Sequence, residues 1–339
     1  MRRRSSGLAG VASVYIGSVV GAGFATGQEI WQFFAAFSYH GLWGVGLAAL
    51  LLGVAGACTL RLARLAGCKH YGQMLSLVLG PGLAPVADVV LGLLAMAAVG
   101  LMLSGAGEVF AEHLRLPAWT GAGLTATVSL GAVLARGRGL AYVNMVFVPF
   151  LVVMTLAVSL LSWAPGPTGE AMAAWVGPWW PWAAVLYAAY NFVLAFAVLA
   201  GFGGGLTRGQ EWGGMVGGAA IGFLALAVAR TLVARPELGR AWAIPMLVLA
   251  AEAGRGWFLA YTLALWVAIS TSVAGGIYAL ALRLEPYLPY RAACVLAAFG
   301  PLFLARFPFA GLVGHFYPAM GYLGLVLGVA VVVSSVKRR

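Results

Sequence analysis

Long apolar runs, separated by short charged or Pro/Gly-rich breaks, make up almost the whole chain. Each run is near or above the roughly 20 residues that a helix needs to cross a bilayer. Of the 339 residues, 63% are hydrophobic and 9% are charged, whereas soluble domains carry about 25% charged residues. We therefore expect the lipid bilayer to surround the chain. The runs predict about ten membrane-spanning helices, near 9–37, 42–66, 86–111, 119–136, 140–163, 182–201, 214–234, 258–282, 290–306 and 311–335.

The positive charge of the chain is explained by its topology. A net charge of +11 could indicate nucleic-acid binding, but most basic residues fall in alternate loops, as the positive-inside rule requires. Nucleic acid is therefore not an expected partner. An even number of spans then places both termini in the cytoplasm. The expected location of the protein is the inner membrane of a bacterial cell. Examples on the cytoplasmic side are Arg2, Arg3, Arg4, Arg61, Arg64, Lys337, Arg338 and Arg339.

The pattern of runs repeats after about half the chain. Five spans in 1–170 correspond to five in 171–339, and because five is odd, the second set must run with opposite orientation. No soluble domain is expected, since the longest less apolar segments, 67–85 and 235–257, look amphipathic enough to lie on the membrane surface. The sequence thus predicts an all-α protein with an inverted repeat, as in secondary transporters whose first repeat helices are broken at mid-membrane.

The first run contains its own interruption, "GSVVGAGFATGQE". Four glycines, Gly17, Gly21, Gly23 and Gly27, each weaken a helix by roughly 1 kcal/mol. Unwound backbone at membrane depth is tolerated where it lines a cavity or is buried in protein. We expect a break here, with Gly21, Ala22, Gly23, Thr26 and Gln28 near a substrate. Close helix packing of the small-xxx-small type is the alternative explanation for these glycines.

Glu29 is the charge next to this break. One role for it is structural, because Thr26 and Glu29 fit a capping box in which Thr26 accepts from the Glu29 amide. The other role is functional, as a proton acceptor or as a counter-ion for a cationic substrate group. Both roles remain open from the sequence.

Polar residues also interrupt the sixth and eighth runs. A second break is expected in the sixth run at 187–191, with Tyr187, Tyr190 and Asn191 at the substrate, although the tyrosines could instead be interfacial anchors. In the eighth run, Thr271 and Ser272 belong to three consecutive hydroxyls, with the Ala268 carbonyl one turn earlier. Hydroxyls often bond back to their own helix, but this group also offers the oxygen ligands that a small cation needs.

The stretch "GSVVGAGFATGQEIWQFF", together with "YAAYN", resembles the YkvI-like family of bacterial membrane proteins. That family is a branch of the amino acid-polyamine-cation (APC) transporter superfamily with the leucine-transporter (LeuT) fold. The resemblance implies a sodium site between the broken first helix and the eighth helix. Its oxygens would come from the carbonyls of Gly17, Val20 and Ala268 and from the hydroxyls of Thr271 and Ser272. It favours Na⁺ as the coupling ion, with H⁺ as the alternative.

The expected function is cation-coupled transport of a small amine-bearing solute, such as an amino acid, by alternating access. A negative charge at Glu29 would repel a bound carboxylate, so an amine-bearing substrate fits better. An intramembrane enzyme is not expected, because the chain lacks HExxH, GxSxG and a pair of membrane aspartates. A ligand sensor on the same fold remains an alternative. No cofactor is expected, and the oligomeric state is left open.

Overall fold

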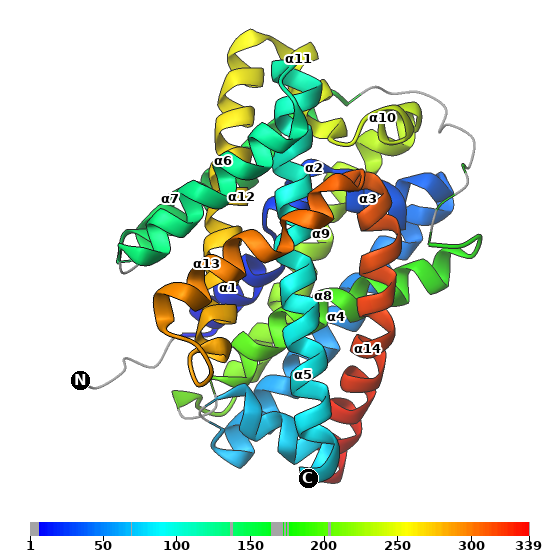
Figure 1. Cartoon of the computed structure of the whole chain (residues 1–339). Helices are drawn as coiled ribbons and strands as arrows, with labels where there is room; N and C mark the ends of the chain where they lie inside the picture. The colour runs from blue at the N-terminus through cyan, green and yellow to red at the C-terminus, as the bar shows by residue number, and fades with distance from the viewer. Residues whose placement is uncertain are drawn as a thin grey trace.

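The protein is almost entirely helical. The computed structural model describes residues 7–68, 70–135, 138–163, 172, 174, 176–202 and 205–338, and no strand occurs among them. Figure 1 shows long helices running from one end of the molecule to the other. The expected all-α membrane fold is confirmed. Arg2, Arg3, Arg4, Arg339 and the predicted repeat boundary at 170 lie outside the described residues, so the division into 1–170 and 171–339 stays a prediction.

The first half of the chain contains one interrupted helix followed by four longer ones. Its elements are α1 (Leu8–Val19), α2 (Ala22–Thr26), α3 (Gln28–Phe33), η1 (Ala35–Phe37), α4 (Tyr39–Ala66), α5 (Tyr71–Glu108), the π-helix η2 (Val109–His113), α6 (Ala118–Leu134) and α7 (Arg138–Leu161).

In the described part of the second half, five α-helices of ten or more residues are accompanied by shorter helices. Its elements are α8 (Trp180–Ala200), η4 (Gln210–Trp212), α9 (Gly213–Ala234), α10 (Glu237–Ala241), α11 (Pro245–Ala253), α12 (Arg255–Leu284), α13 (Tyr290–Phe299), η5 (Gly300–Arg306) and α14 (Phe309–Lys337).

Six helical segments of the described chain are long and apolar enough to cross a membrane. The other predicted spans correspond to shorter or interrupted helices, such as α1 and α6. The six long segments are Tyr39–Ala66, Tyr71–His113, Trp180–Ala200, Gln210–Ala234, Arg255–Leu284 and Phe309–Lys337.

Glycines allow the central helices to approach closely. A Cβ at Gly218 of α9 would lie 2.4 Å from the amide nitrogen of Gly53 on α4. On α14, a Cβ at Gly324 would lie 2.1 Å from the carbonyl oxygen of Ala189 on α8. In a bilayer, where lipid tails remove most of the hydrophobic driving force between helices, such close backbone packing holds a bundle together.

The two segments expected on the membrane surface behave differently. Segment 67–85 is largely half-exposed, and its helix changes direction at Gly80, which has a φ of 79°. Segment 235–257 is amphipathic: Ile244, Met246 and Leu247 in and before α11 are fully buried, whereas Glu237, Arg240 and Glu252 are exposed. Its position at the membrane surface stays a prediction. In Figure 1, α10 and α11 lie at the end of the molecule opposite the C-terminus. Apolar residues of this segment face the protein because they cover the broken first helix.

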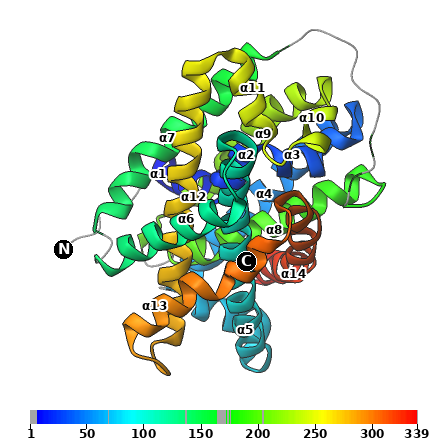
Figure 2. The same cartoon turned by 45° about the horizontal axis from the view of Figure 1, so that its top comes forward.

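The interrupted helix lies inside the bundle. In Figure 2, α1 and α2 lie among the longer helices α5, α6 and α12, and α3 continues toward α10. Val11, Tyr15, Phe24 and Ile30 along these three helices are buried. The break is therefore enclosed by protein, which is the environment in which unwound backbone is tolerated at membrane depth.

Candidate functional site

The break in the first helix lies at Val20 and Gly21. Both residues are extended, with ψ angles of 91° and −158°, between the end of α1 and the start of α2. The last four carbonyls of a helix have no intrahelical donor, so those at the end of α1 are available as ligands. A Cβ at Gly17 or Gly21 would have no neighbour within 4 Å. Close helix packing is therefore wrong as the explanation for these two glycines.

A second change of direction occurs at Gly27, whose φ of +80° separates α2 from α3. The expected capping box does not form. Thr26 Oγ1 accepts from the Gln28 amide at 3.2 Å and donates to the Gly23 carbonyl at 2.6 Å, so it is not bonded to the Glu29 amide. With the left-handed Gly27 as the N-cap residue, α3 has no side-chain cap. Glu29 is thereby released from a capping role.

A cavity of about 780 Å³ opens beside the break. Its wall includes Gly21, Ala22, Gly23, Glu29 and Asn191 from the expected substrate residues. Thr26, Gln28, Tyr187 and Tyr190 lie behind this wall rather than in it. The cavity extends along α5 and α12 as far as Tyr71 and Arg283, at the end of the bundle where α5 begins and α12 ends.

Glu29 is the charged side chain deep in this cavity. It is 3% exposed, and its Oε1 atom has no hydrogen-bond partner. Its Oε2 atom and the Tyr317 hydroxyl both approach Gly23, at 3.2 Å and 3.0 Å from the position that a Cβ would take there. An isolated buried carboxylate is costly unless it is paired or protonated, so this site calls for a cation or a proton.

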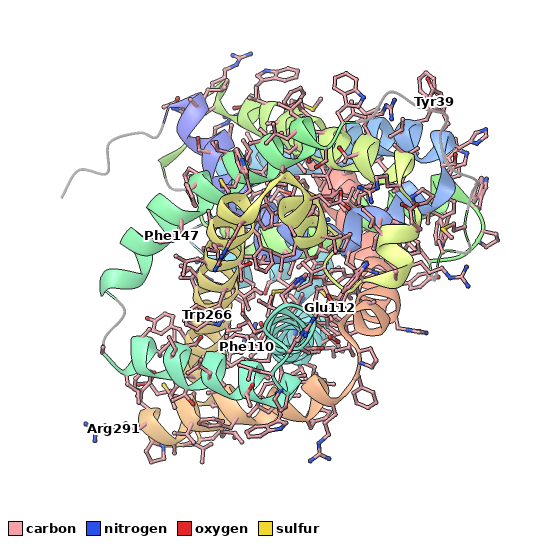
Figure 3. All side chains as sticks on the ribbon, turned by 90° about the horizontal axis from the view of Figure 1, so that it is seen from above. Tyr39, Phe110, Glu112, Phe147, Trp266 and Arg291 are labelled. Atoms are coloured by element: carbon pink, nitrogen blue, oxygen red, sulfur yellow. The ribbon has the colours of Figure 1, made fainter. Side chains whose placement is uncertain are left out.

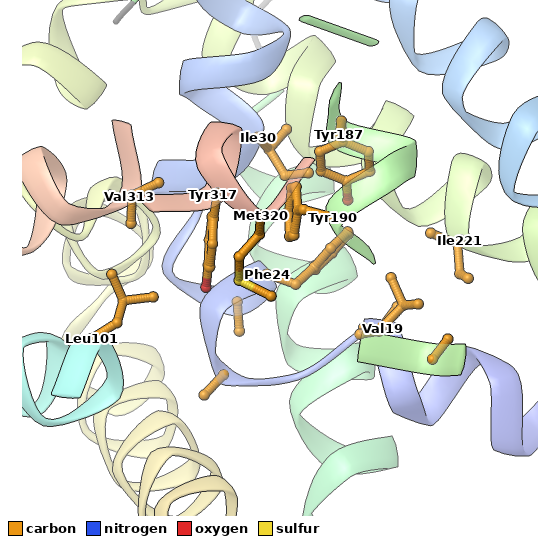
Figure 4. Close-up of a cluster of buried hydrophobic side chains, with 14 of the residues drawn as sticks. Val19, Phe24, Ile30, Leu101, Tyr187, Tyr190, Ile221, Val313, Tyr317 and Met320 are labelled. Carbon is orange, nitrogen blue, oxygen red and sulfur yellow. The ribbon is translucent and has the colours of Figure 1, made fainter. Parts of the chain in front are cut away.

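Aromatic rings surround the carboxylate. The rings of Tyr190 and Tyr317 are stacked, with centroids 4.4 Å apart and planes 6° apart, and Tyr187 meets Tyr190 edge-on at 5.4 Å. Figure 4 shows Tyr317 coming from α14 and Tyr187 and Tyr190 from α8. The buried hydroxyls of Tyr187 and Tyr190 make no hydrogen bond of normal geometry, and the Tyr190 hydroxyl lies near the Glu29 carboxylate. Buried polar groups of this kind are usually bonded, so their grouping marks a site for a ligand.

The expected second break, at 187–191, is absent. Helix α8 is continuous from Trp180 to Ala200, and Asn191 Nδ2 donates to the Tyr187 carbonyl at 3.0 Å. The polar residues are therefore accommodated within a regular helix. Only the first helix of the two expected ones is interrupted within its apolar run.

The expected ion ligands lie on both sides of the cavity. Gly17 of α1 and Ser272 of α12 line it, whereas Val20, Ala268 and Thr271 are buried beside it. Thr271 Oγ1 donates to the Ala268 carbonyl at 3.0 Å. These residues fit a hard cation by chemistry, since all their donors are oxygens. Among the described residues, no group of three or more His, Cys, Asp and Glu could hold a metal ion.

One end of the cavity is bounded by an ion-pair cluster. Arg283 of α12 donates to both carboxylate oxygens of Asp88 at 3.0 and 3.1 Å and to the Tyr71 hydroxyl at 2.6 Å. Tyr71 in turn donates to Asp88 at 2.6 Å. The guanidinium is therefore neutralised by Asp88. This cluster ties the start of α5 to the end of α12.

The opposite end is covered by α10 and α11. Trp31 Nε1 donates to the Pro236 carbonyl at 2.8 Å, and Gln28 Nε2 donates to the Gly239 carbonyl at 3.3 Å. From the end of α5, the Glu112 carboxylate accepts from the Ala243 amide at 2.8 Å. Figure 3 views this end from above and shows Glu112 close to the axis of α5. These contacts hold α10 and the residues that flank it against α3 and η2.

Tyr317, Met102 and Met320 also line the cavity, although the sequence analysis did not single them out. Tyr317 stands in "GHFYPAM" in the last run, directly before Pro318. A phenol beside a proline in an apolar span is a usable signal. Met102 and Met320 gave no such signal, because methionine commonly fills apolar cores.

The helix order and the interrupted first helix define a membrane protein with the LeuT-type fold. The structure is similar to that of Mhp1 in its inward-facing conformation, with a TM-score of 0.62, 12% identity, and coverage of 97% of this chain and 76% of that one. It is also similar to MhsT in complex with L-phenylalanine, with a TM-score of 0.61, 15% identity and full coverage of both chains. At these identities the likeness concerns the fold.

Sequence relatives show the family. The chain is 30% identical over 337 residues to the membrane protein YkvI of Bacillus subtilis (strain 168), covering 97% of this chain and 96% of YkvI. It is 26% identical over 329 residues to YyaD of the same organism, with 92% of each chain covered. No protein-family model matches the chain. The chain belongs to the YkvI family of membrane proteins.

Proposed function

We propose that this protein is a cation-coupled secondary transporter of a small amine-bearing solute, such as an amino acid, in the bacterial cell membrane. The observation that carries the proposal is the buried carboxylate of Glu29, whose Oε1 atom has no partner, in a cavity lined by the broken first helix. Transporters of inverted-repeat architecture bind substrates at such breaks. Membership of the APC superfamily, with both termini in the cytoplasm, belongs to the same proposal.

Sodium is the proposed coupling ion. It would bind between α1 and α12, with oxygens from Gly17, Val20, Ala268, Thr271 and Ser272. The exposure of Gly17 and Ser272 to one cavity supports this assignment, as does the set of uncharged oxygen donors.

Alternating access would move α1, α2, α3, α4, α8 and α9 against the remaining helices. The cavity reaches Arg283 and Tyr71 at one end, while α10 and α11 cover the other end. With the N-terminus in the cytoplasm, this arrangement corresponds to a state open to the inside. Binding of the ion and the solute would favour closure, because a ligand shifts an equilibrium by its differential affinity for the two states.

Uptake into proteoliposomes tests the proposal. An inward Na⁺ gradient is expected to drive accumulation of at least one amine or amino acid, and choline in place of Na⁺ is expected to abolish it. Thr271→Ala with Ser272→Ala should remove the Na⁺ dependence. Absence of accumulation under both sodium and proton gradients would contradict the proposal.

Proton coupling through Glu29 is the second candidate. It is favoured by the burial of Glu29 and by the missing partner of its Oε1 atom, which a proton would satisfy. Under this alternative, a pH gradient would drive uptake without Na⁺, and Glu29→Gln would abolish that uptake.

A further inference from the structure

The residues that line the cavity specify more about the substrate than that it carries an amine. At Gly23, a carboxylate and a phenol approach the backbone closely because the residue has no side chain. The Tyr317 hydroxyl, the Glu29 Oε2 atom and the Met102 methyl lie 3.0, 3.2 and 3.5 Å from the position of a Cβ there. A carboxylate oxygen and a phenol are thus close together at the cavity wall beside Gly23. An ammonium group in the cavity, with up to three N–H donors, can donate to both.

The tyrosine stack holds this point in place. Tyr317 is 4% exposed, and its ring lies flat against that of Tyr190. Tyr190 is packed in turn against Phe33 at 5.4 Å and against Tyr187. Figure 4 shows the group beside Met320 and Phe24. Because the rings cannot turn freely, the Tyr317 hydroxyl is positioned before a ligand binds, and the aromatic electrons add attraction for a cation.

The cavity offers no matching site for a carboxylate. Among the described residues that line it, Arg283 is the one cationic side chain, and its guanidinium is occupied by Asp88 and Tyr71. The backbone opened by the break is a possible anion site, but Gly23 in it lies directly beside the Glu29 carboxylate. A substrate carboxylate there would meet like charge at short range and in low dielectric.

Most of the remaining wall is apolar. It includes Phe24, Leu91, Leu94, Met102, Phe196 and Met320. Such a surface favours a hydrophobic body attached to the cationic group, since burial of apolar area contributes about 25 cal/mol per Å².

We infer that the cavity selects a monovalent organic amine with an apolar body and no carboxylate, with Glu29 as its counter-ion and Tyr317 as a specificity-determining residue. This inference rests on the proposed function, because it assigns the substrate class of the same cavity. The ammonium group of an amino acid could pair with Glu29, but its carboxylate would have no cationic partner and would be repelled by Glu29.

A pair of ligands that differ by one carboxylate tests the inference. Binding of phenethylamine and of L-phenylalanine to the purified full-length protein is measured by isothermal titration in NaCl at pH 7. We expect phenethylamine to bind at least tenfold more tightly. Glu29→Gln should weaken phenethylamine at least tenfold and remove the discrimination. Tyr317→Phe should weaken it about threefold, while Tyr322→Phe, an exposed tyrosine on the same helix, should have no effect.

Gly23→Ala is the second variant, used in case Glu29→Gln fails to fold. Its methyl group would occupy the point between Tyr317 and Glu29 and should weaken phenethylamine in the same way. Equal or tighter binding of L-phenylalanine overturns the inference, and so does phenethylamine binding that is unchanged in both variants. The inference is also overturned when neither phenethylamine nor hexylamine binds the wild-type protein.

Uptake separates this inference from the proposed function. Sodium-driven accumulation of L-phenylalanine, without accumulation of phenethylamine, contradicts the inferred substrate class but supports the proposed transport function. Binding of phenethylamine that depends on Glu29, without accumulation of any solute under a sodium or proton gradient, supports the substrate class and contradicts transport.

Discussion

Two polar stretches of the chain, 17–29 and 187–191, lie in apolar runs, and only the first interrupts its helix. In the first, α1 ends at Val19 and the chain changes direction at Gly21 and again at Gly27. In the second, α8 passes through Tyr187 and Asn191 without deviation. The two stretches resemble each other in polarity and differ in glycine content, since Trp180–Ala200 contains no glycine.

Polarity alone therefore does not break a membrane helix. An asparagine or a tyrosine can stay in a regular helix when its side chain bonds to the helix itself, as Asn191 does, or packs among other rings, as Tyr190 does. A break needs residues that lose little by leaving helical geometry, and glycine is the residue that does so. The polar groups near the break are then free to meet a ligand.

The largest expected effect comes from disturbing the continuous helix. Gly324→Val on α14 would drive a side chain into the Ala189 carbonyl of α8, which lies 2.1 Å from a Cβ. Neither backbone can shift cheaply, so we expect a loss of more than about 3 kcal/mol and failure to purify as a monodisperse protein. Gly123→Ala, with no neighbour within 4 Å, is the control in size-exclusion chromatography. Normal elution and melting of Gly324→Val would contradict the packing of α8.

Gly27→Ala should have the next largest effect. An alanine at a φ of +80° costs about 1–2 kcal/mol, and its methyl would also lie 2.7 Å from Met246 Cγ. The matched control is Gly17→Ala, which meets nothing within 4 Å and lies within α1; a helical alanine there should be neutral or stabilise by up to about 1 kcal/mol. Melting temperatures of both variants check this. Equal shifts would show that the turn at Gly27 is not required.

Asn191→Ala should lower the free energy of unfolding by less than Gly27→Ala. It removes one hydrogen bond to the Tyr187 carbonyl, worth about 1 kcal/mol, and leaves α8 helical. Hydrogen exchange of the amides in 187–195 is expected to stay slow. Fast exchange across this segment would mean that Asn191 holds a potential break closed.

Glu29→Gln should have the smallest effect on stability, within about 1 kcal/mol, because Oε1 of the wild-type side chain has no partner to lose. The stabilisation by an amine ligand, in contrast, should disappear. Thermal unfolding with and without phenethylamine measures both quantities in one experiment. A large loss of stability in the absence of ligand would indicate that Glu29 has a structural role instead.

Much of the fold could be predicted from the sequence, because hydrophobic run length decides where helices cross a bilayer. Ten runs and an interrupted first helix followed from length and glycine placement. The contacts of the buried face of 235–257 could not be predicted, because its apolar residues serve a tertiary contact, with Trp31 and Gly27 among their neighbours. The break expected in α8 was wrong because side-chain bonding within that helix cannot be seen from composition.

The candidate site was predicted in part. Glu29, Gly23 and Asn191 were named from their polarity or position in apolar runs, and all three line the cavity. Tyr317 was not named, because its contact with Gly23 joins residues nearly 300 positions apart, and only tertiary structure makes that pair adjacent. The capping box failed because Gly27 takes the left-handed conformation and separates Thr26 from the Glu29 amide.

The most direct test of a sodium-coupled site at the break is the melting temperature in NaCl against choline chloride at equal ionic strength. Wild-type protein should melt higher in sodium, because an ion that binds only the folded state stabilises it by mass action. The double variant Thr271→Ala, Ser272→Ala should melt at the same temperature in both salts. A sodium shift that survives in the double variant, or a wild-type protein that melts alike in both salts, would contradict the site.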